Sequence, residues 1–266
     1  MGHPVAVERD GHVETWTLNL PEQRNPITGH DVIDALEGLV DAANDDVDVR
    51  VVILTGAGSA FSTGGNVRHM IDGEGMFGLP PAQQMYAYRT GIQRIPRALA
   101  RLRAPIIAAV NGPAVGAGCD LVCMCDLRIA STNAWFAESF VKLGIIPGDG
   151  GAWLLPRAIG DARAREMAFT GDRIDAQTAL EWGLVSQVVE PDELLPAARA
   201  LAARIAVNPP LAVRMTKQLI AGAAHQTLDE VLDLSAGMQA LAHQTEDHRR
   251  ALEAARDRRV GEYRGR

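Results

Sequence analysis

The sequence lacks the features of a membrane or secreted protein. Among its 266 residues there is no run of about 18 apolar residues, the length that a membrane-spanning helix needs. The N-terminal stretch does not resemble a secretory signal, because Glu8 and the two charged residues after it interrupt the stretch early. Only three cysteines are present, and an odd number in a chain without a signal indicates a reducing compartment. These absences predict a cytoplasmic protein without a membrane span.

A dense basic patch is also missing. The formal net charge is -7 and the isoelectric point is ≈ 5.5. The arginines near the C-terminus are mixed with acidic residues, which is typical of a solvated helix face. Nucleic acid is therefore not an expected partner.

Several catalytic and nucleotide-binding motifs are absent. The glycines at 56, 58, 64 and 65 do not form a GxGxxG motif, and no acidic residue lies at ribose distance with strand support, which argues against nicotinamide binding. The chain contains no GxxxxGK[ST], GxSxG or HExxH sequence, which argues against P-loop chemistry, a serine nucleophile elbow and a zinc-protease helix. No His, Cys or paired carboxylate follows the cysteines Cys119, Cys123 and Cys125 at the spacing of metal ligands. We expect no metal site and interpret the cysteines as part of an apolar core helix.

The chain is organised around Pro105–Asp126, PIIAAVNGPAVGAGCDLVCMCD. The apolar run Ile106–Val110 predicts a buried strand, and the spacing of Cys119–Cys125 predicts a buried helix that begins at small residues around Ala117. The first N–H groups of a helix have no partner within it and carry partial positive charge. This turn is therefore suited to a phosphate, a carboxylate or a thioester oxyanion. Tight packing of a buried helix is the alternative explanation.

Strands and helices alternate along most of the chain, which predicts an α/β fold with parallel strands. Strands are predicted at 13–20, 49–55, 106–110, 128–131 and 184–189. Helices are predicted at 31–43, 66–71, 83–102, 119–125, 153–159, 162–170, 175–182 and 191–207. The loop Gly56–Gly65 closes a strand and leaves a second set of backbone N–H groups exposed. Asp72–Pro81 contains too many Gly and Pro residues for regular structure, and it is a candidate mobile lid.

After the firm break at Asn208-Pro209-Pro210, only helices are predicted, at 211–224, 227–242 and 246–259. A helical tail without a strand partner is a common way to build an oligomer interface. We therefore divide the chain into an α/β core, residues 1–207, and a C-terminal helical oligomerisation region, residues 208–266.

Four segments resemble the crotonase superfamily, the enoyl-CoA hydratase/isomerase family. They are residues 51–67, 105–130, 136–160 and 168–189, and they match in order and spacing. The resemblance implies a spiral of ββα units whose C-terminal helices form homotrimers, often paired into hexamers. It also implies an acyl-CoA substrate and no cofactor other than the coenzyme A of that substrate.

The resemblance further implies the positions of the binding residues. The thioester carbonyl would lie between the N–H groups of Gly65 and Ala117, where each donor stabilises a developing enolate by roughly 3 kcal/mol. The positive charge of Arg24 suits the phosphates of coenzyme A, although an ordinary solvated loop cation has the same features. The implied substrate-binding residues are Arg24, Asn25, Ala60, Ser62, Asn66 and Phe140.

The acid/base positions depart from the family pattern. Hydratases of the family carry two glutamates; the first falls on Asp120, and the second falls on Phe140, which cannot transfer a proton. Glu138 is two residues from that position, which on a helix turns it by roughly 200° toward another face. Asp149 lies one position later than the aspartate of some isomerases of the family. Asp120 and Asp149 are the candidate catalytic residues; a buried or capping carboxylate and a turn-forming Asp are the alternatives.

The leading hypothesis is an enzyme that isomerises or hydrates an enoyl-CoA through a stabilised enolate. A second hypothesis keeps the enolate but changes the reaction to thioester hydrolysis or carbon–carbon cleavage. A third is an acyl-CoA binder that has lost its catalytic glutamates, and Phe140 is the residue that favours it.

Overall fold

A six-stranded sheet forms the centre of the computed structural model, which describes residues 3–266. The strand order is β1-β2-β3-β4-β6-β9, with β1 and β2 antiparallel and the other neighbours parallel. The strands are Val5–Asp10 (β1), Val13–Leu18 (β2), Val51–Gly56 (β3), Ile106–Val110 (β4), Leu127–Ser131 (β6) and Gln187–Val189 (β9).

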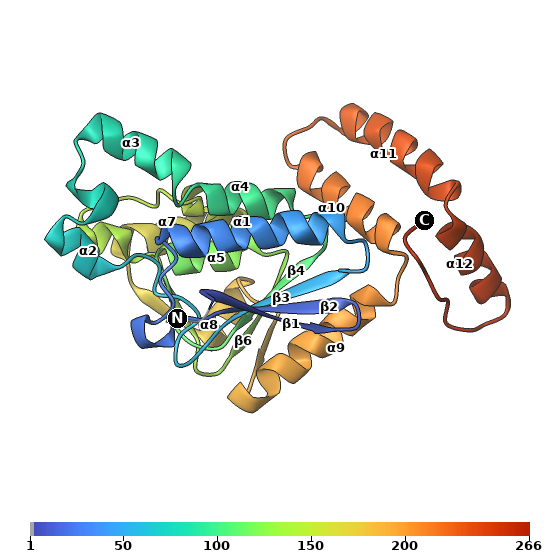
Figure 1. Ribbon diagram of the computed structural model, residues 1–266, viewed down its shortest axis with the longest axis horizontal. Helices are drawn as coiled ribbons and strands as arrows, with labels where there is room; N and C mark the ends of the chain where they lie inside the picture. Colours follow the sequence, from blue (N-terminus) through green and yellow to red (C-terminus); the bar gives the residue numbers. More distant parts are fainter. Residues whose placement is uncertain (1–2) are drawn as a thin grey trace.

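Helices cover both faces of this sheet (Figure 1). On one face lie His30–Asp45 (α1), Arg94–Arg101 (α4) and Ala117–Met124 (α5); on the other lies Leu194–Ala206 (α9), which follows the short turn Pro191–Glu193 (η4). Along β3, Val52 and Leu54 belong to the core under α1 and α5, whereas Val51 and Ile53 pack against α9. This period of two explains why β3 is a continuous apolar run, because both of its faces are buried.

A second, three-stranded sheet carries the chain into α5. It consists of Ala114–Val115 (β5), Trp135–Ala137 (β7) and Arg173–Asp175 (β8) in the order β5-β7-β8. Around it lie Ser139–Leu143 (η3), Gly151–Ile159 (α6), Asp161–Thr170 (α7) and Ala176–Trp182 (α8). Because β5 ends just before α5 begins, this sheet helps fix the place of the α5 N-terminus.

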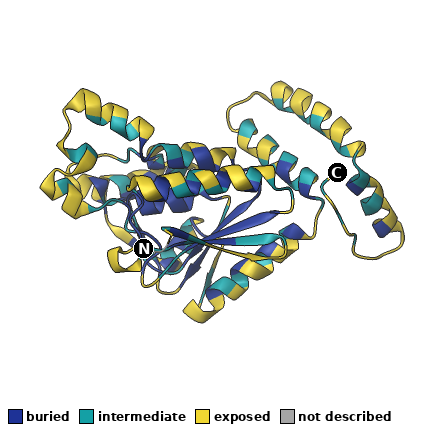
Figure 2. Ribbon diagram, viewed as in Figure 1, coloured by how far each residue is buried: buried dark blue, intermediate teal, exposed yellow. Residues whose placement is uncertain are grey.

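The remaining helices lie at the two ends of the molecule (Figure 1). At one end are the segments Pro21–Gln23 (η1), Val67–Asp72 (α2), Gly75–Gly78 (η2) and Pro81–Thr90 (α3). At the other end, Pro210–Ala223 (α10), Leu228–His243 (α11) and Glu246–Arg256 (α12) extend away from the sheet. No residue of α11 is buried (Figure 2), and its exposed leucines include Leu228, Leu232 and Leu241. Within residues 3–266, every helix is too short or too polar to span a bilayer.

The predicted α/β class and the C-terminal helices are confirmed, with local corrections. Strand β1 was not predicted, because four of its six residues are exposed and give no apolar alternation. The helix predicted at 83–102 is two helices, α3 and α4, separated at Gly91, whose φ of -109° and ψ of -117° are not helical. The predicted loop at 72–81 contains the turn η2.

Candidate functional site

A cavity of about 930 Å³ opens beside α2 and the N-terminus of α5. Its wall is built by the segments that follow β3 and β4, by η3 and by the loop before α6. Both small-residue turns that the sequence singled out therefore contribute to one cavity.

The turn after β3 is held against the start of α5 by backbone pairing. Ser62 pairs with Ala114, and Pro26 pairs with Gly64, in isolated parallel bridges. Gly64 has a φ of +75°, and a Cβ on it would lie 2.8 Å from the amide nitrogen of Ala117. The close approach of the two turns therefore requires glycine at position 64.

Gly65 and Ala117 both line the cavity. Neither N–H donates a hydrogen bond to any of residues 3–266. Ala117 is the first residue of α5, so the amide of Ala117 is one of the unpaired donors of a helix N-terminus. The preceding Gly116 has a φ of 54°. The amides of Gly65 and Ala117 are the two predicted oxyanion donors, and the fold brings them to the same cavity.

Asp149 is the buried carboxyl group of the cavity wall. Its side chain is 6% exposed, and Oδ1 has no hydrogen-bond partner in the described chain. Burial raises the pKa of Asp149 to about 6. The neighbouring Tyr88 phenol has a raised pKa, because it is half-buried and faces the charge of Asp149. The loop that carries Asp149 is held by Gln93, whose Nε2 donates to Gly148 O at 3.0 Å. Because the pKa of Asp149 is about 6, this carboxyl group can exchange protons near neutral pH.

Asp120 lies behind the cavity rather than on its wall. The residue is fully buried on α5, and neither carboxyl oxygen has a partner among residues 3–266. Its carboxyl group packs so closely against Gly151 that a Cβ there would clash. The pKa of Asp120 is raised well above its usual range, first by burial and then by the charges of Glu138 and Asp149, while the amide of Gly151 acts in the opposite direction.

As expected, Glu138 does not face the cavity with Phe140, but a helical turn is not the reason. Glu138 precedes η3 with a φ of -92° and a ψ of 64°, so the step from residue 138 to residue 140 is not helical. Its side chain is 1% exposed and lies beside Asp120. Burial, followed by the charge of Cys123, raises the pKa of Glu138 to about 7. A glutamate directly after the buried strand β7 was the available signal in the sequence.

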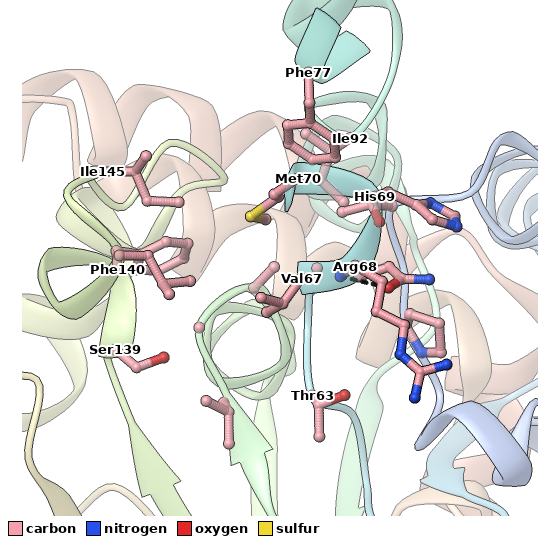
Figure 3. Close-up of a pocket in the computed structure, with 18 of the residues that line it drawn as sticks. Thr63, Val67, Arg68, His69, Met70, Phe77, Ile92, Ser139, Phe140 and Ile145 are labelled. Carbon is pink, nitrogen blue, oxygen red and sulfur yellow. Dashed lines mark hydrogen bonds between the residues drawn. The ribbon is translucent and has the colours of Figure 1, made fainter. Parts of the chain in front are cut away.

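Phe140 faces the cavity from the opposite side to α2 (Figure 3). It is 8% exposed, and its ring Cζ would lie 3.5 Å from a Cβ placed on Gly116. Ile145 and Met70 lie near it, so this part of the wall is apolar, whereas Arg68 lies on the far side of α2 from Phe140 (Figure 3). The cavity therefore has an apolar part and a part lined by charged side chains of both signs. Sequence reasoning did not identify the wall residues Met70 and Tyr88.

Of the other predicted binding residues, Arg24 and Asn66 line the cavity. Asn66 also caps α2, because its Oδ1 accepts from Arg68 N at 3.1 Å. The structure does not bring Asn25, Ala60 or Ser62 to the wall.

Asn25 and Ser62 instead bind backbone groups. The Asn25 amide donates to Ala57 O and Ala60 O, each at 2.9 Å, and its oxygen accepts from Leu20 N at 2.9 Å. The Ser62 hydroxyl donates to Asn25 O at 2.7 Å and accepts from Gly64 N at 3.1 Å. These side chains fix the two loops whose ends form the wall.

Comparisons with known proteins show the family of the chain. The sequence model of the enoyl-CoA hydratase/isomerase family matches residues 8–266. The chain is 38% identical over 265 residues to (E)-benzylidenesuccinyl-CoA hydratase of Thauera aromatica, covering 98% of this chain and 99% of that protein. It is 37% identical over 259 residues to 1,2-epoxyphenylacetyl-CoA isomerase of Escherichia coli, covering 96% and 97%.

Solved structures give the same result. The crystal structure of enoyl-CoA hydratase from Bacillus anthracis superposes with a TM-score of 0.92 at 34% identity, covering 99% of this chain and 100% of that one. The expected crotonase-type fold is thereby confirmed. Two adjoining glycine turns, a full-length sequence match and a full-length structural match lead to one conclusion: the chain belongs to the enoyl-CoA hydratase/isomerase family.

Proposed function

We propose that this enzyme shifts the double bond of an enoyl-CoA by moving a proton, with the thioester oxygen held by the amides of Gly65 and Ala117. One observation carries the proposal: two unpaired backbone donors and one unpaired carboxyl oxygen, that of Asp149, belong to the same cavity. Loss of the α-proton places negative charge on the thioester oxygen. Donors already fixed at that point are worth roughly 3 kcal/mol each to the transition state.

In this mechanism the Asp149 carboxylate removes the α-proton and forms the dienolate. The same group returns the proton to the γ-carbon, so the double bond moves and no atom is gained or lost. A single acid/base group is sufficient for this transfer. The apolar wall around Phe140 suits the acyl chain, and its exclusion of water protects the dienolate.

Hydration of the double bond is the second candidate. The chain is an enzyme of the hydratase/isomerase type, and its relatives include proteins named as hydratases at 38% and 36% identity and one named as an isomerase at 37%. Hydration requires a second polar group to hold the attacking water. Phe140 cannot do this, and Glu138 is not on the cavity wall, so isomerisation is the better-supported reaction.

The remaining predicted residues support this chemistry in different ways. Asp120 acts as an acid/base partner behind Asp149, since the charge of Asp149 acts on its carboxyl group. Arg24 at the cavity wall binds the phosphates of coenzyme A, and Asn66 orients α2 beside them. Asn25, Ala60 and Ser62 act through the loops that they hold.

We also propose the cofactor requirement, the location and the assembly of the enzyme. The enzyme uses no cofactor other than the coenzyme A of its substrate, and it works in the cytoplasm. It assembles as a homotrimer or a dimer of trimers through residues 208–266, where the exposed leucines of α11 offer an apolar contact surface.

Product mass tests the proposed reaction. We expect a β,γ-unsaturated acyl-CoA to give an α,β-unsaturated product of the same mass, which chromatography separates from the substrate. A product heavier by one water would establish hydration instead. Release of free coenzyme A would establish thioester hydrolysis.

The pH dependence of kcat/KM follows from Asp149. Because the pKa of this group is about 6, it is an ionised base above that pH and a protonated acid below it. We expect kcat/KM to be level above the pKa and to fall about tenfold for each pH unit below it. Initial rates at low substrate concentration measure this profile, and a flat profile through the acid range would exclude Asp149 as the base.

A further inference from the structure

Two carboxyl groups meet in the interior behind the cavity. The side chains of Asp120 and Glu138 lie within hydrogen-bond reach of each other, yet none of their oxygens has a partner in residues 3–266. Two ionised carboxylates cannot satisfy one another, because neither has a hydrogen to donate. If one of them is protonated, its O–H donates to the other. The contact is therefore a hydrogen bond only when the pair holds a proton.

The surroundings favour a retained proton. The two residues are 0% and 1% exposed, so water does not stabilise their charges. The other groups that act on them are the thiols of Cys119 and Cys123 on α5, the carboxyl of Asp149 before α6 and the amide of Gly151. No cation is among these groups. Two buried like charges without a counter-ion are costly, so the pair gives up its last proton only with difficulty.

We propose that Glu138 is a positioning residue of this site: it shares a single proton with Asp120 and thereby holds Asp120 as a neutral acid behind Asp149. The proposal rests on the proposed function, because it explains how one wall carboxylate can work beside two others. The pair then carries one negative charge behind the cavity instead of two, so it repels the charge of Asp149 less. Asp149 therefore remains free to ionise near neutral pH, as a base at the cavity must.

The location of the proton within the pair follows from what the carboxyl group of Asp120 faces. This group packs against Gly151, two residues after Asp149, so a charge on Asp120 would lie beside the loop that carries Asp149. The proton is therefore held mainly on Asp120, and its O–H donates toward Glu138. This arrangement is a coupled titration, in which the pair and not one residue binds the proton.

Carbon-13 NMR of protein labelled at the aspartate carboxyl carbons tests the proposal. The signal of Asp120 is assigned by its loss in Asp120→Asn, and it is then followed against pH in the wild type and in Glu138→Gln. Gln keeps the size of Glu, donates an amide hydrogen to Asp120 and removes the second acid. We expect Asp120 to be protonated at pH 7 in the wild type. In Glu138→Gln, we expect the pKa of Asp120 to be lower by about one unit or more.

Asp247→Asn is the matched control. Asp247 is also 1% exposed, but its carboxyl oxygens accept from Arg264 N at 2.8 Å and from Gly265 N at 2.7 Å. This change should leave the titration of Asp120 unaltered. An ionised Asp120 at pH 7 in the wild type, or an equal pKa in Glu138→Gln, would overturn the shared proton. The NMR measurement needs no turnover, so its outcome is separate from the product-mass test of the proposed function.

Discussion

Replacing Asp149 with Asn should lower kcat/KM at pH 7 by about 10²–10⁴-fold while making the folded protein more stable. The activity falls because an amide cannot accept the α-proton. The stability rises because burial raises the pKa of Asp149 from 3.8 to about 6, so ionisation at pH 7 opposes folding by about 3 kcal/mol at most. Initial rates and the thermal midpoint Tm measure the two effects.

The sign of the stability effect follows from the direction of the pKa shift. A carboxyl group whose pKa is higher in the folded state binds its proton more tightly there. Its favourable contribution is complete below the unfolded pKa and is lost as the pH rises through about 6. Asn does not ionise, so the variant does not lose stability as the pH rises. The Tm difference between variant and wild type should therefore shrink as the pH falls.

Asp172→Asn is the control for this experiment. Asp172 is an exposed residue between α7 and β8, its Oδ1 lies 2.8 Å from Lys142 Nζ, and it is not on the cavity wall. An exposed ion pair contributes little, so this change should leave both kcat/KM and Tm near their wild-type values. Wild-type activity in Asp149→Asn would remove the proton-transfer role.

Gly64→Ala should lower kcat by about 100-fold or more, because it disturbs the oxyanion donors. A Cβ at position 64 would lie 2.6 Å from Val115 O and 2.8 Å from Ala117 N, and both contacts are to backbone. The backbone must shift to relieve them, and the shift moves the Ala117 amide from the thioester oxygen. Steady-state kinetics and the affinity for free coenzyme A measure the change, and the affinity should be largely retained.

Gly183→Ala separates this effect from backbone strain. Gly183 ends α8 with a φ of +82°, close to the +75° of Gly64, but the nearest atom to its added Cβ is Ala158 O at 3.9 Å. Both variants therefore carry a similar conformational cost of about 1 kcal/mol, and only one of them presses on the donors. If the two variants lose activity equally, the close packing of Gly64 against the Ala117 amide is not what positions the oxyanion donors.

The elements that the sequence predicted well are those whose signal is local. β3 and β4 are apolar runs because both of their faces are covered, and small-residue turns end them. Strand β1 was not predicted, because its edge position leaves most of its side chains in water. The division between α3 and α4 was not predicted, because it depends on the backbone of a single residue, Gly91.

The same distinction applies to the candidate site. A helix that starts at small residues has unpaired amides whatever surrounds it, so Ala117 could be found from its own segment. The partner Gly65 and the carboxyl Asp149 came from the family resemblance, since residues distant in sequence meet only in the fold. Asn25 and Ser62 turned out to bind backbone, because loops around them need donors and acceptors that only the folded chain reveals.

By itself, the sequence determined the α/β class, the two glycine turns with their free amides and the family, because each depends on patterns within short segments. Only the tertiary structure decided that both amides belong to one cavity, that Asp149 rather than Asp120 lies on its wall and that Glu138 meets Asp120. The reason is that the direction of a side chain after a strand is set by packing against distant parts of the chain. The protonation of those carboxyl groups then follows from the water and cations that this packing excludes.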